Sequence, residues 1–183
     1  MGQSTGRPVD SWHLSGTELR SVLAALPVDE YDRFVSCFDD VAGGRLFLSG
    51  QGRSGLAAQM AAMRFMHLGL TAHFVGEATA PSVRSGDTLV IVSGSGRTPV
   101  SVGFARIARS EGAKVLLVTH QRKSPLRDLA HGSVVLPADA SRQFGGTLFE
   151  QSALILLDSV VLELMRGLPD PAGTMSHNHT NLQ

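Results

Sequence analysis

The sequence contains a single cysteine, Cys37, among its 183 residues. One thiol cannot form a disulfide within the chain, which excludes a disulfide-stabilised secreted scaffold and predicts a cytoplasmic protein. A surplus of charge is also missing, because 16 Lys and Arg residues balance 16 Asp and Glu residues. The chain therefore lacks the broad positive field that holds a nucleic acid or an anionic membrane. We expect any anionic ligand to be bound at a local site.

Long apolar runs are absent as well. The longest, ALILL at residues 153–157, ends at Asp158, far short of the about 20 residues that span a bilayer. Residues 1–10, MGQSTGRPVD, have neither the apolar core nor the basic flank of a targeting segment. Apolar residues still make up 43% of the chain, which is enough for a sizeable core. We expect one globular domain over residues 1–183, with no membrane or nucleic-acid partner.

From residue 45 onward, short apolar runs alternate with helical patterns. Strands are predicted at residues 45–49, 71–75, 88–93, 114–119 and 133–137. Helices are predicted at residues 54–68, 98–111 and 147–165, with a short helical turn after Ser124. The runs VIV, VLLV and VVL are continuously apolar, as in strands covered on both faces, so we expect a parallel sheet between two layers of helices.

The two ends of the chain differ from this alternating core of residues 45–166. A helical segment within residues 1–44 is predicted to contain helices at 17–25 and 28–41. The tail from residue 167 to 183, which contains Pro169, Pro171 and Gly173, is predicted to be irregular.

A glycine-rich turn joins the first strand to the first core helix in LFLSGQGRSGLA, residues 46–57. Gly50, Gly52 and Gly55 fit the dinucleotide-binding pattern GxGxxG, with Glu77 as a candidate ribose acceptor. Glu77 follows Gly50 by 27 residues, whereas that fingerprint places the acidic residue about 20 residues on. The dinucleotide interpretation is therefore weak.

A second polar loop follows the third strand, in SGSGRTPV at residues 93–100. Its hydroxyl and main-chain donors come from Ser93, Gly94, Ser95, Gly96 and Thr98 at the start of a helix. Small hydroxyls and helix-start amides together suit one phosphate dianion without a metal ion. Each loop alone also fits an ordinary turn or helix cap, but two such loops in one β–α–β series favour a phosphate site, to which Ser54 would add a hydroxyl.

Several segments resemble the sugar isomerase (SIS) domain family and, within it, the 6-phospho-3-hexuloisomerases of formaldehyde fixation through ribulose monophosphate. The segments are GQGRSG, MRFMHLG, FVGEATAPS, GDTLVIVSGSGRT, GTLFEQSALILLD and HTNLQ, in the family's order. Gln51 and Gln151 depart from the family pattern, which often has Val and Glu there. The resemblance implies a flavodoxin-like, three-layer α/β/α fold with a five-stranded parallel sheet, and a homotetramer or dimer whose sites lie near subunit boundaries.

The resemblance also implies an activity and its residues. These enzymes interconvert D-arabino-hex-3-ulose 6-phosphate and fructose 6-phosphate through a cis-enediolate, without a metal or cofactor. It implies phosphate binding by Ser54 and residues 93–98, a carboxylate base at Glu150 and a second candidate at His67. Two alternatives stay open: an isomerase of an aldose phosphate such as arabinose 5-phosphate, and a non-catalytic sugar-phosphate sensor.

Each candidate residue also has a structural interpretation. Thr147 and Glu150 fit a capping box, in which the carboxylate only satisfies a helix-start amide. His67 fits a buried core or interface histidine. Its functional alternative is proton transfer, in its own site or in that of a neighbouring subunit.

The two loop arginines and the tail histidines have further interpretations. Arg53, which follows Gly52, flanks the first loop, and Arg97 lies in the second. Each either steers the phosphate or is a solvated surface charge. A metal site at His177 and His179 is rejected because no third ligand has suitable spacing. We instead expect the tail, including His179, to fold over an active site. The surplus of apolar residues on the helix at 54–68 predicts subunit contacts.

Overall fold

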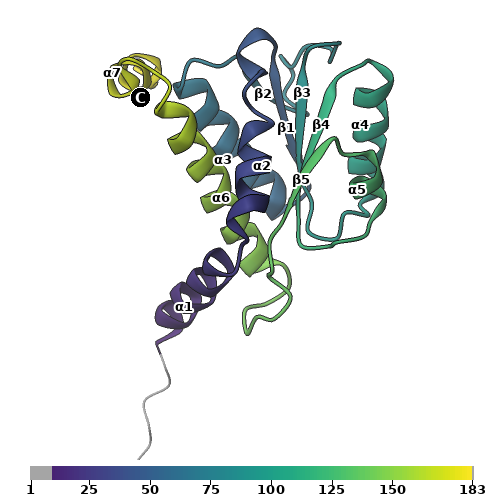
Figure 1. Cartoon of the computed structure of the whole chain (residues 1–183), viewed down its shortest axis with the longest axis vertical. Helices are drawn as coiled ribbons and strands as arrows, with labels where there is room; N and C mark the ends of the chain where they lie inside the picture. Colours follow the sequence, from purple (N-terminus) through teal and green to yellow (C-terminus); the bar gives the residue numbers. More distant parts are fainter. Residues whose placement is uncertain (1–9, 183) are drawn as a thin grey trace, which may run out of the picture.

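Five parallel strands form one sheet in the computed structural model, which describes residues 10–182 (Figure 1). Residues 1–9, where the sequence predicts no targeting segment, lie outside the described part. The strand order is β2-β1-β3-β4-β5. The bounds are β1 Leu46–Gly50, β2 Ala72–Phe74, β3 Thr88–Val92, β4 Lys114–Thr119 and β5 Gly132–Val135. The expected five-stranded parallel sheet is confirmed.

Helices cover both faces of this sheet. On one face lie α2, α3 and α6, and on the other lie α4 and α5 (Figure 1). The bounds are α1 Ser11–Ala24, α2 Val28–Ser36, α3 Arg53–His67, α4 Pro99–Ser110, α5 Pro125–Leu129, α6 Thr147–Met165 and α7 Pro171–Asn178. A short 3-10 helix spans Val41–Gly43. The three-layer α/β/α arrangement expected from the sequence is thereby confirmed.

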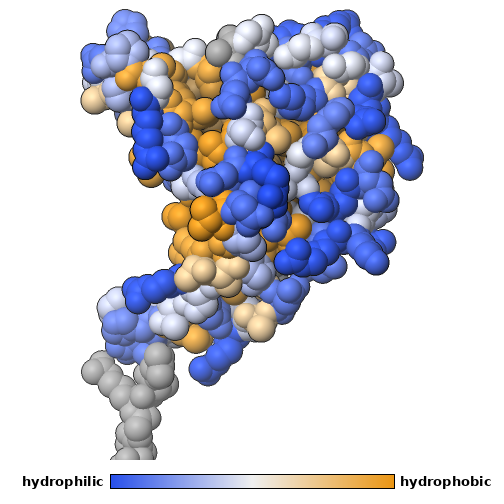
Figure 2. Space-filling view, viewed as in Figure 1, coloured by the Kyte–Doolittle hydropathy of each residue, from blue (hydrophilic) through white to orange (hydrophobic). Residues whose placement is uncertain are grey.

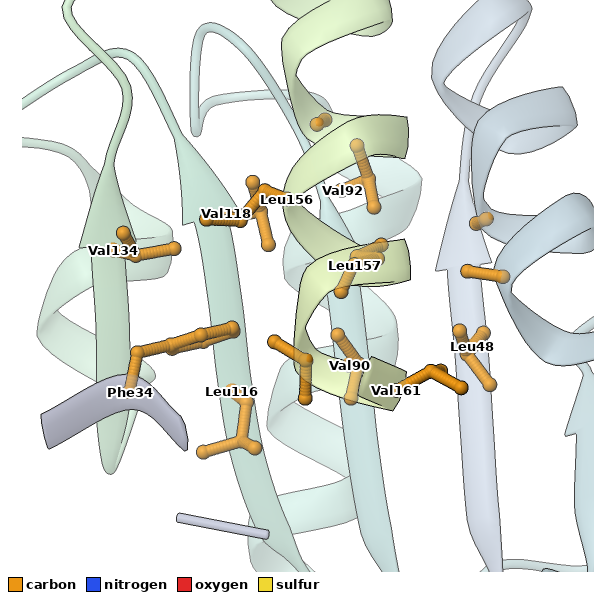
Figure 3. Packing of buried hydrophobic residues seen from close by; sticks show 14 of the residues in the cluster. Phe34, Leu48, Val90, Val92, Leu116, Val118, Val134, Leu156, Leu157 and Val161 are labelled. Carbon is orange, nitrogen blue, oxygen red and sulfur yellow. The ribbon is translucent and has the colours of Figure 1, made fainter. Parts of the chain in front are cut away.

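Successive side chains along each strand point to opposite faces of the sheet and pack into two hydrophobic cores. Toward α3 and α6, Val90, Leu116 and Val118 are fully buried against Leu157 and its neighbours on α6 (Figure 3). On the opposite face the buried side chains include Phe47, Leu89, Ile91, Val115 and Leu117. Burial on both faces explains why these strands are continuously apolar in sequence.

The structure corrects two expectations at the ends of the chain. The tail contains a helix, α7, rather than irregular structure throughout. Its start is well specified, because Pro171 occupies the first turn and the Asp170 side chain accepts a hydrogen bond from the Gly173 amide at 2.9 Å. Leu168 and Met175 then pack against the core cluster.

The N-terminal helices also have different bounds. The first begins at Ser11 rather than at residue 17, and the second ends at Ser36 rather than near residue 41. Residues 37–43 tighten into turns and the 3-10 helix, which buries Phe38 and Val41 before β1 begins.

Candidate active site

The strand order leads us to expect a crevice beyond the carboxyl ends of β1 and β3. Gly50 at the end of β1 pairs with Val92 at the end of β3, so the following loops leave the sheet side by side. The next helices diverge, α3 to one face and α4 to the other (Figure 1). In an open parallel sheet of this order, ligands bind at this switch point, beyond the carboxyl ends of the strands.

Glycines in the first loop bring α3 close to its strand. A Cβ at Gly50 would lie 2.6 Å from the Ser54 carbonyl carbon, and one at Gly55 would lie 2.7 Å from the Gly50 carbonyl oxygen. Gly52 has a φ of 58°, a conformation that favours glycine. Close packing and a left-handed turn thus account for the GxGxxG spacing without a dinucleotide. Arg53 and Ser54 lie in the first turn of α3, at the crevice.

The second loop has hydroxyls that the protein itself does not use. Ser93 is 5% exposed, and among the described residues its Oγ has no hydrogen-bond partner. Thr98 precedes α4 at the N-cap position, yet its side chain makes no capping hydrogen bond. Only Ser95 behaves as an ordinary turn residue, because its Oγ accepts a hydrogen bond from the Arg97 amide at 3.2 Å. A buried hydroxyl without a partner is costly unless a ligand or water satisfies it.

The loop after β4 supports the second loop from behind. The Thr119 hydroxyl donates to the Gly94 carbonyl oxygen at 2.8 Å, and the Leu126 amide donates to the Gly96 carbonyl oxygen at 3.1 Å. Gly96 has a φ of 63°, and a Cβ there would overlap the Ser124 side chain. Sequence reasoning missed this support. The available signal was the polar residue Thr119 at the end of the strand next to β3.

Glu150 reaches the crevice from the start of α6. Its Oε2 accepts a hydrogen bond from Arg53 Nε at 2.5 Å, joining the first turn of α3 to that of α6. The capping-box interpretation is wrong, because α6 has Gly146 at its N-cap with no side-chain capping bond, and the Thr147 hydroxyl donates to the Phe144 carbonyl oxygen. The Glu150 side chain is 17% exposed, whereas that of Arg53 is 61% exposed. A carboxylate is thus held at the crevice while the guanidinium faces solvent.

Two other candidates are less closely associated with this pair. Arg97 is exposed, and its guanidinium donates to the Lys123 carbonyl oxygen at 3.4 Å. Glu77 lines a different hollow, of about 270 Å³, beside Phe104 of α4. Arg97 therefore stays at the second loop, whereas Glu77 lies in a hollow that Glu150 does not line.

His67 and His179 form a second cluster at the far end of α3. His67 ends α3, 14 residues after Arg53, which at about 1.5 Å per residue separates their backbones by about 21 Å. Its ring stacks on that of His179 with 5.1 Å between centroids, and the Asn178 side-chain amide donates to its carbonyl oxygen at 3.1 Å. Burial lowers the pKa of His67, and His179 and Arg64 lower it further.

This separation limits what one chain can do. Within a single chain His67 and Glu150 lie too far apart to act on the same small substrate. The catalytic role of His67 therefore stays a prediction, and this geometry favours the version in which it acts in a neighbouring subunit's site. Within residues 10–182, no group of three or more His, Cys, Asp or Glu side chains is placed to hold a metal ion. The helices of the described part are also too short or too polar to cross a membrane.

Comparison with known proteins connects this site to a family. The family model described as SIS domain matches residues 42–162, well over half of the chain. The chain belongs to the SIS domain family. Both polar loops and Glu150 lie within the matched SIS segment, whereas α1, α2 and α7 lie outside it.

Individual relatives cover most of the chain. A protein of Mycobacterium gastri named 3-hexulose-6-phosphate isomerase is 40% identical over 151 residues, which span 78% of this chain and 76% of the relative. A Methylomonas aminofaciens protein of the same name is 34% identical over 161 residues, spanning 83% and 87%.

A solved structure is similarly close. It is that of a hypothetical protein from Methanococcus jannaschii, for which a molecular function of 3-hexulose-6-phosphate isomerase is inferred. It superposes with a TM-score of 0.85 at 30% identity, over 96% of this chain and 100% of that one.

Proposed function

We propose that this protein is an isomerase that interconverts D-arabino-hex-3-ulose 6-phosphate and D-fructose 6-phosphate. One observation carries the proposal: the Ser93 loop, whose buried hydroxyl has no partner within residues 10–182, and the Glu150 carboxylate lie at the same edge of the sheet. The names of the relatives agree with the activity that the sequence resemblance implies, and favour it over the aldose phosphate and sensor alternatives.

The phosphoryl group of the substrate binds at the start of α4. Within the described part of the chain the hydroxyls of Ser93 and Thr98 and the amides of residues 94, 95 and 98 have no other partner and act as donors, and Ser54 adds a hydroxyl from the other loop. The positive end of the α4 dipole stabilises the dianion without a metal ion. Anchoring one end of an open-chain sugar directs its carbonyl end toward the start of α6.

Glu150 then moves a proton between two neighbouring carbons. In the direction of fructose 6-phosphate, its carboxylate removes the C2 proton of the 3-ketose, and the C3 carbonyl oxygen becomes the enediolate oxygen. The proton then returns to C3, while a hydroxyl proton passes from O2 to O3. These transfers leave the carbonyl at C2 and a hydroxyl at C3, so no atom is gained or lost. A positioned base of this kind supplies about 10²–10⁴ in rate.

The guanidinium next to the base has a part in this chemistry. Arg53 is already bonded to Glu150 through Nε, and its remaining N–H groups are available to the enediolate oxygen. A donor placed where negative charge develops stabilises the transition state more than the ground state. Gly52, whose turn places Arg53, supports this role through the backbone alone.

A second copy of the chain completes the site in this proposal. The outer face of α3 exposes Leu56, Met60, Met63 and Met66, and α6 exposes Ile155 and Leu162. Figure 2 shows apolar side chains gathered over the α6 side of the molecule. Arg53 and Glu150 lie in a hollow whose other lining residues include Leu56 and Met60, so the apolar face continues into the site.

The symmetry of such a contact explains the distant histidines. If α3 packs on its copy about a two-fold axis that passes near Met60 at right angles to the helix, the two helices run antiparallel. Residue 53 of one chain then lies opposite residue 67 of the other. His67 and His179 of one subunit would thus reach the Arg53 end of its neighbour, in a homotetramer or a dimer. We place the protein in the cytoplasm, with a small sugar phosphate as its partner.

Turnover of the purified chain tests the proposal. The assay supplies the hexulose phosphate and couples fructose 6-phosphate formation to an absorbance signal. A second arm supplies arabinose 5-phosphate and measures its own ketose product, ribulose 5-phosphate. Replacing Glu150 with Gln should lower kcat by about 10²–10⁴ with little change in KM. Glu163→Gln, near the other end of the same helix, is the matched control and should leave kcat unchanged. Near-normal turnover by the Glu150→Gln variant would eliminate the base, and turnover of arabinose 5-phosphate alone would eliminate the substrate.

A further inference from the structure

A histidine at the end of β4 lies against the second polar loop, whose residues 93–98 we call the phosphate loop. His120 follows Thr119 directly, and its amide donates to the Gly94 carbonyl oxygen at 3.3 Å. A Cβ at Gly94 would lie 3.1 Å from His120 Cδ2, 3.2 Å from Phe149 Cδ1 and 3.4 Å from His120 Nε2. The Cδ2–Nε2 edge of the imidazole therefore faces the phosphate loop, and glycine at position 94 leaves room for it.

The two ring nitrogens have different surroundings. Nδ1 lies 3.3 Å from Asp139 Oδ1 and 3.0 Å from the side-chain amide nitrogen of Gln121. Nε2 has no hydrogen-bond partner within the described part of the chain. The ring also packs edge-on against Phe149, the residue before Glu150, with 5.7 Å between centroids. The unpartnered nitrogen thus lies between the phosphate loop and the start of α6.

We propose that His120 is a further substrate-binding residue, whose Nε2 donates a hydrogen bond to the phosphoryl group held by residues 93–98. The proposal rests on the proposed function, because it assigns that same site a donor. Both arginines of the loops have other partners, Glu150 for Arg53 and the Lys123 carbonyl for Arg97. His120 adds to the loop an imidazole nitrogen that can donate to a phosphoryl oxygen.

A purely structural role would be to hold the loop at residues 137–146 through Asp139. That loop has a separate and stronger attachment, because the Glu18 carboxylate accepts hydrogen bonds from Ser141 Oγ at 2.7 Å, the Arg142 amide at 2.8 Å and Gln143 Nε2 at 3.0 Å. The Asp139 side chain is 73% exposed, so its bond to His120 contributes little to holding the loop. Asp139 instead serves to orient the imidazole, with Nδ1 outward and Nε2 toward the loop.

Binding of inorganic phosphate and turnover of the hexulose phosphate together test this assignment. His120→Gln and His120→Ala should each raise the phosphate Kd and the KM about tenfold, the usual effect of losing a hydrogen bond to a charged group, with kcat changed much less. Asp139→Asn should raise both constants by a smaller factor without changing kcat. His13→Gln is the control, because His13 also faces an aspartate, Asp10, at 3.7 Å but lies on α1.

Each result decides one of the two proposals. If the wild type isomerises the sugar and the His120 variants keep its KM and phosphate Kd, the assignment of His120 is overturned and the function stands. If the wild type binds phosphate tenfold more tightly than the variants but isomerises nothing, His120 stands and the function falls. If the His120 variants fail to fold, NMR of the imidazole nitrogens of the wild-type protein tests the assignment instead. Added phosphate should shift the His120 Nε2 signal, and an unchanged signal overturns the assignment.

Discussion

Replacing Gly50 with Ala tests whether the glycine spacing of the first loop exists for packing. Gly50 ends β1, and it does not have a positive φ, so alanine meets no backbone strain there. The new methyl group would nevertheless lie 2.6 Å from both the carbonyl carbon and the carbonyl oxygen of Ser54, and 2.8 Å from the Gly55 nitrogen. All three are backbone atoms of the first turn of α3, so relief requires movement of the helix itself.

The expected magnitude follows from this overlap. Overpacking of a well-packed interior costs about 1–3 kcal/mol, and alanine recovers about 0.4–1 kcal/mol by restricting the unfolded chain. We expect a net loss of about 1.3 kcal/mol in the free energy of unfolding, which for a chain of about 150–250 residues lowers Tm by about 3–5 °C. Because Arg53 and Ser54 move with the helix start, kcat/KM for the hexulose phosphate should fall as well.

Gly103→Ala is the matched control for this substitution. Gly103 lies inside α4, and a Cβ there would have no atom within 4 Å. Alanine should therefore raise stability by about 0.5–1 kcal/mol through helix propensity alone. Thermal unfolding followed by circular dichroism measures both variants. A Tm for Gly50→Ala at or above that of the wild type would refute the packing argument.

Three further outcomes are expected. Asp87→Asn should cost about 2–4 kcal/mol, because the Asp87 carboxylate, 5% exposed, is paired with Arg45 at 2.7 Å. Burial works to raise the Asp87 pKa, but the hydrogen bonds from Arg45 and Arg84 outweigh it and lower the pKa below 3.8, so urea titrations should show this stability lost as the pH falls from 3.8 through the folded pKa. The pKa of His67 is lowered from 6.5 by burial and by His179, so the neutral ring's contribution to the free energy of unfolding is full above pH 6.5 and is lost as the pH falls below that value. His67→Asn should reduce this pH dependence of the free energy of unfolding. Met60→Glu, at the centre of the exposed face of α3, should yield a monomer by light scattering, and an unchanged multimer mass would contradict the two-fold contact.

Much of the fold is predictable because its elements have strong local signals. Residues 114–119 and 147–165 have the same bounds in the sequence-based prediction and in the structure. Each segment is rich in apolar residues and its ends have turn or helix-start residues, so local preference and burial agree. The prediction of an irregular tail is wrong for the opposite reason. Its prolines and glycines suggest a loop, whereas Asp170 and Pro171 start a helix that contact with α3 stabilises.

The site is predictable only in part. Polar loops that follow neighbouring parallel strands meet at one sheet edge, and this general rule of topology is enough to place residues 93–98 near residues 52–54. The pairing of Arg53 with Glu150 spans 97 residues and depends on how α3 packs against α6. No local pattern encodes that contact, and the local pattern at Thr147 favours a cap instead. The position of His120 likewise depends on β4 lying next to β3.

The N-terminal helix helps to position the base although it lies outside the matched SIS segment. Glu18 of α1 holds residues 141–143, and this loop leads within a few residues to Glu150. The backbone bond from Arg142 is the main cause of the lowered Glu18 pKa, followed by the bonds from Gln143 and Ser141, so the carboxylate is ionised wherever the enzyme is expected to work. The start of α6 is thus fixed from two sides, by α1 through this loop and by α3 through Arg53. A base that must reach two neighbouring carbons in turn needs a fixed helix start, since a small displacement of a catalytic group costs a large factor in rate.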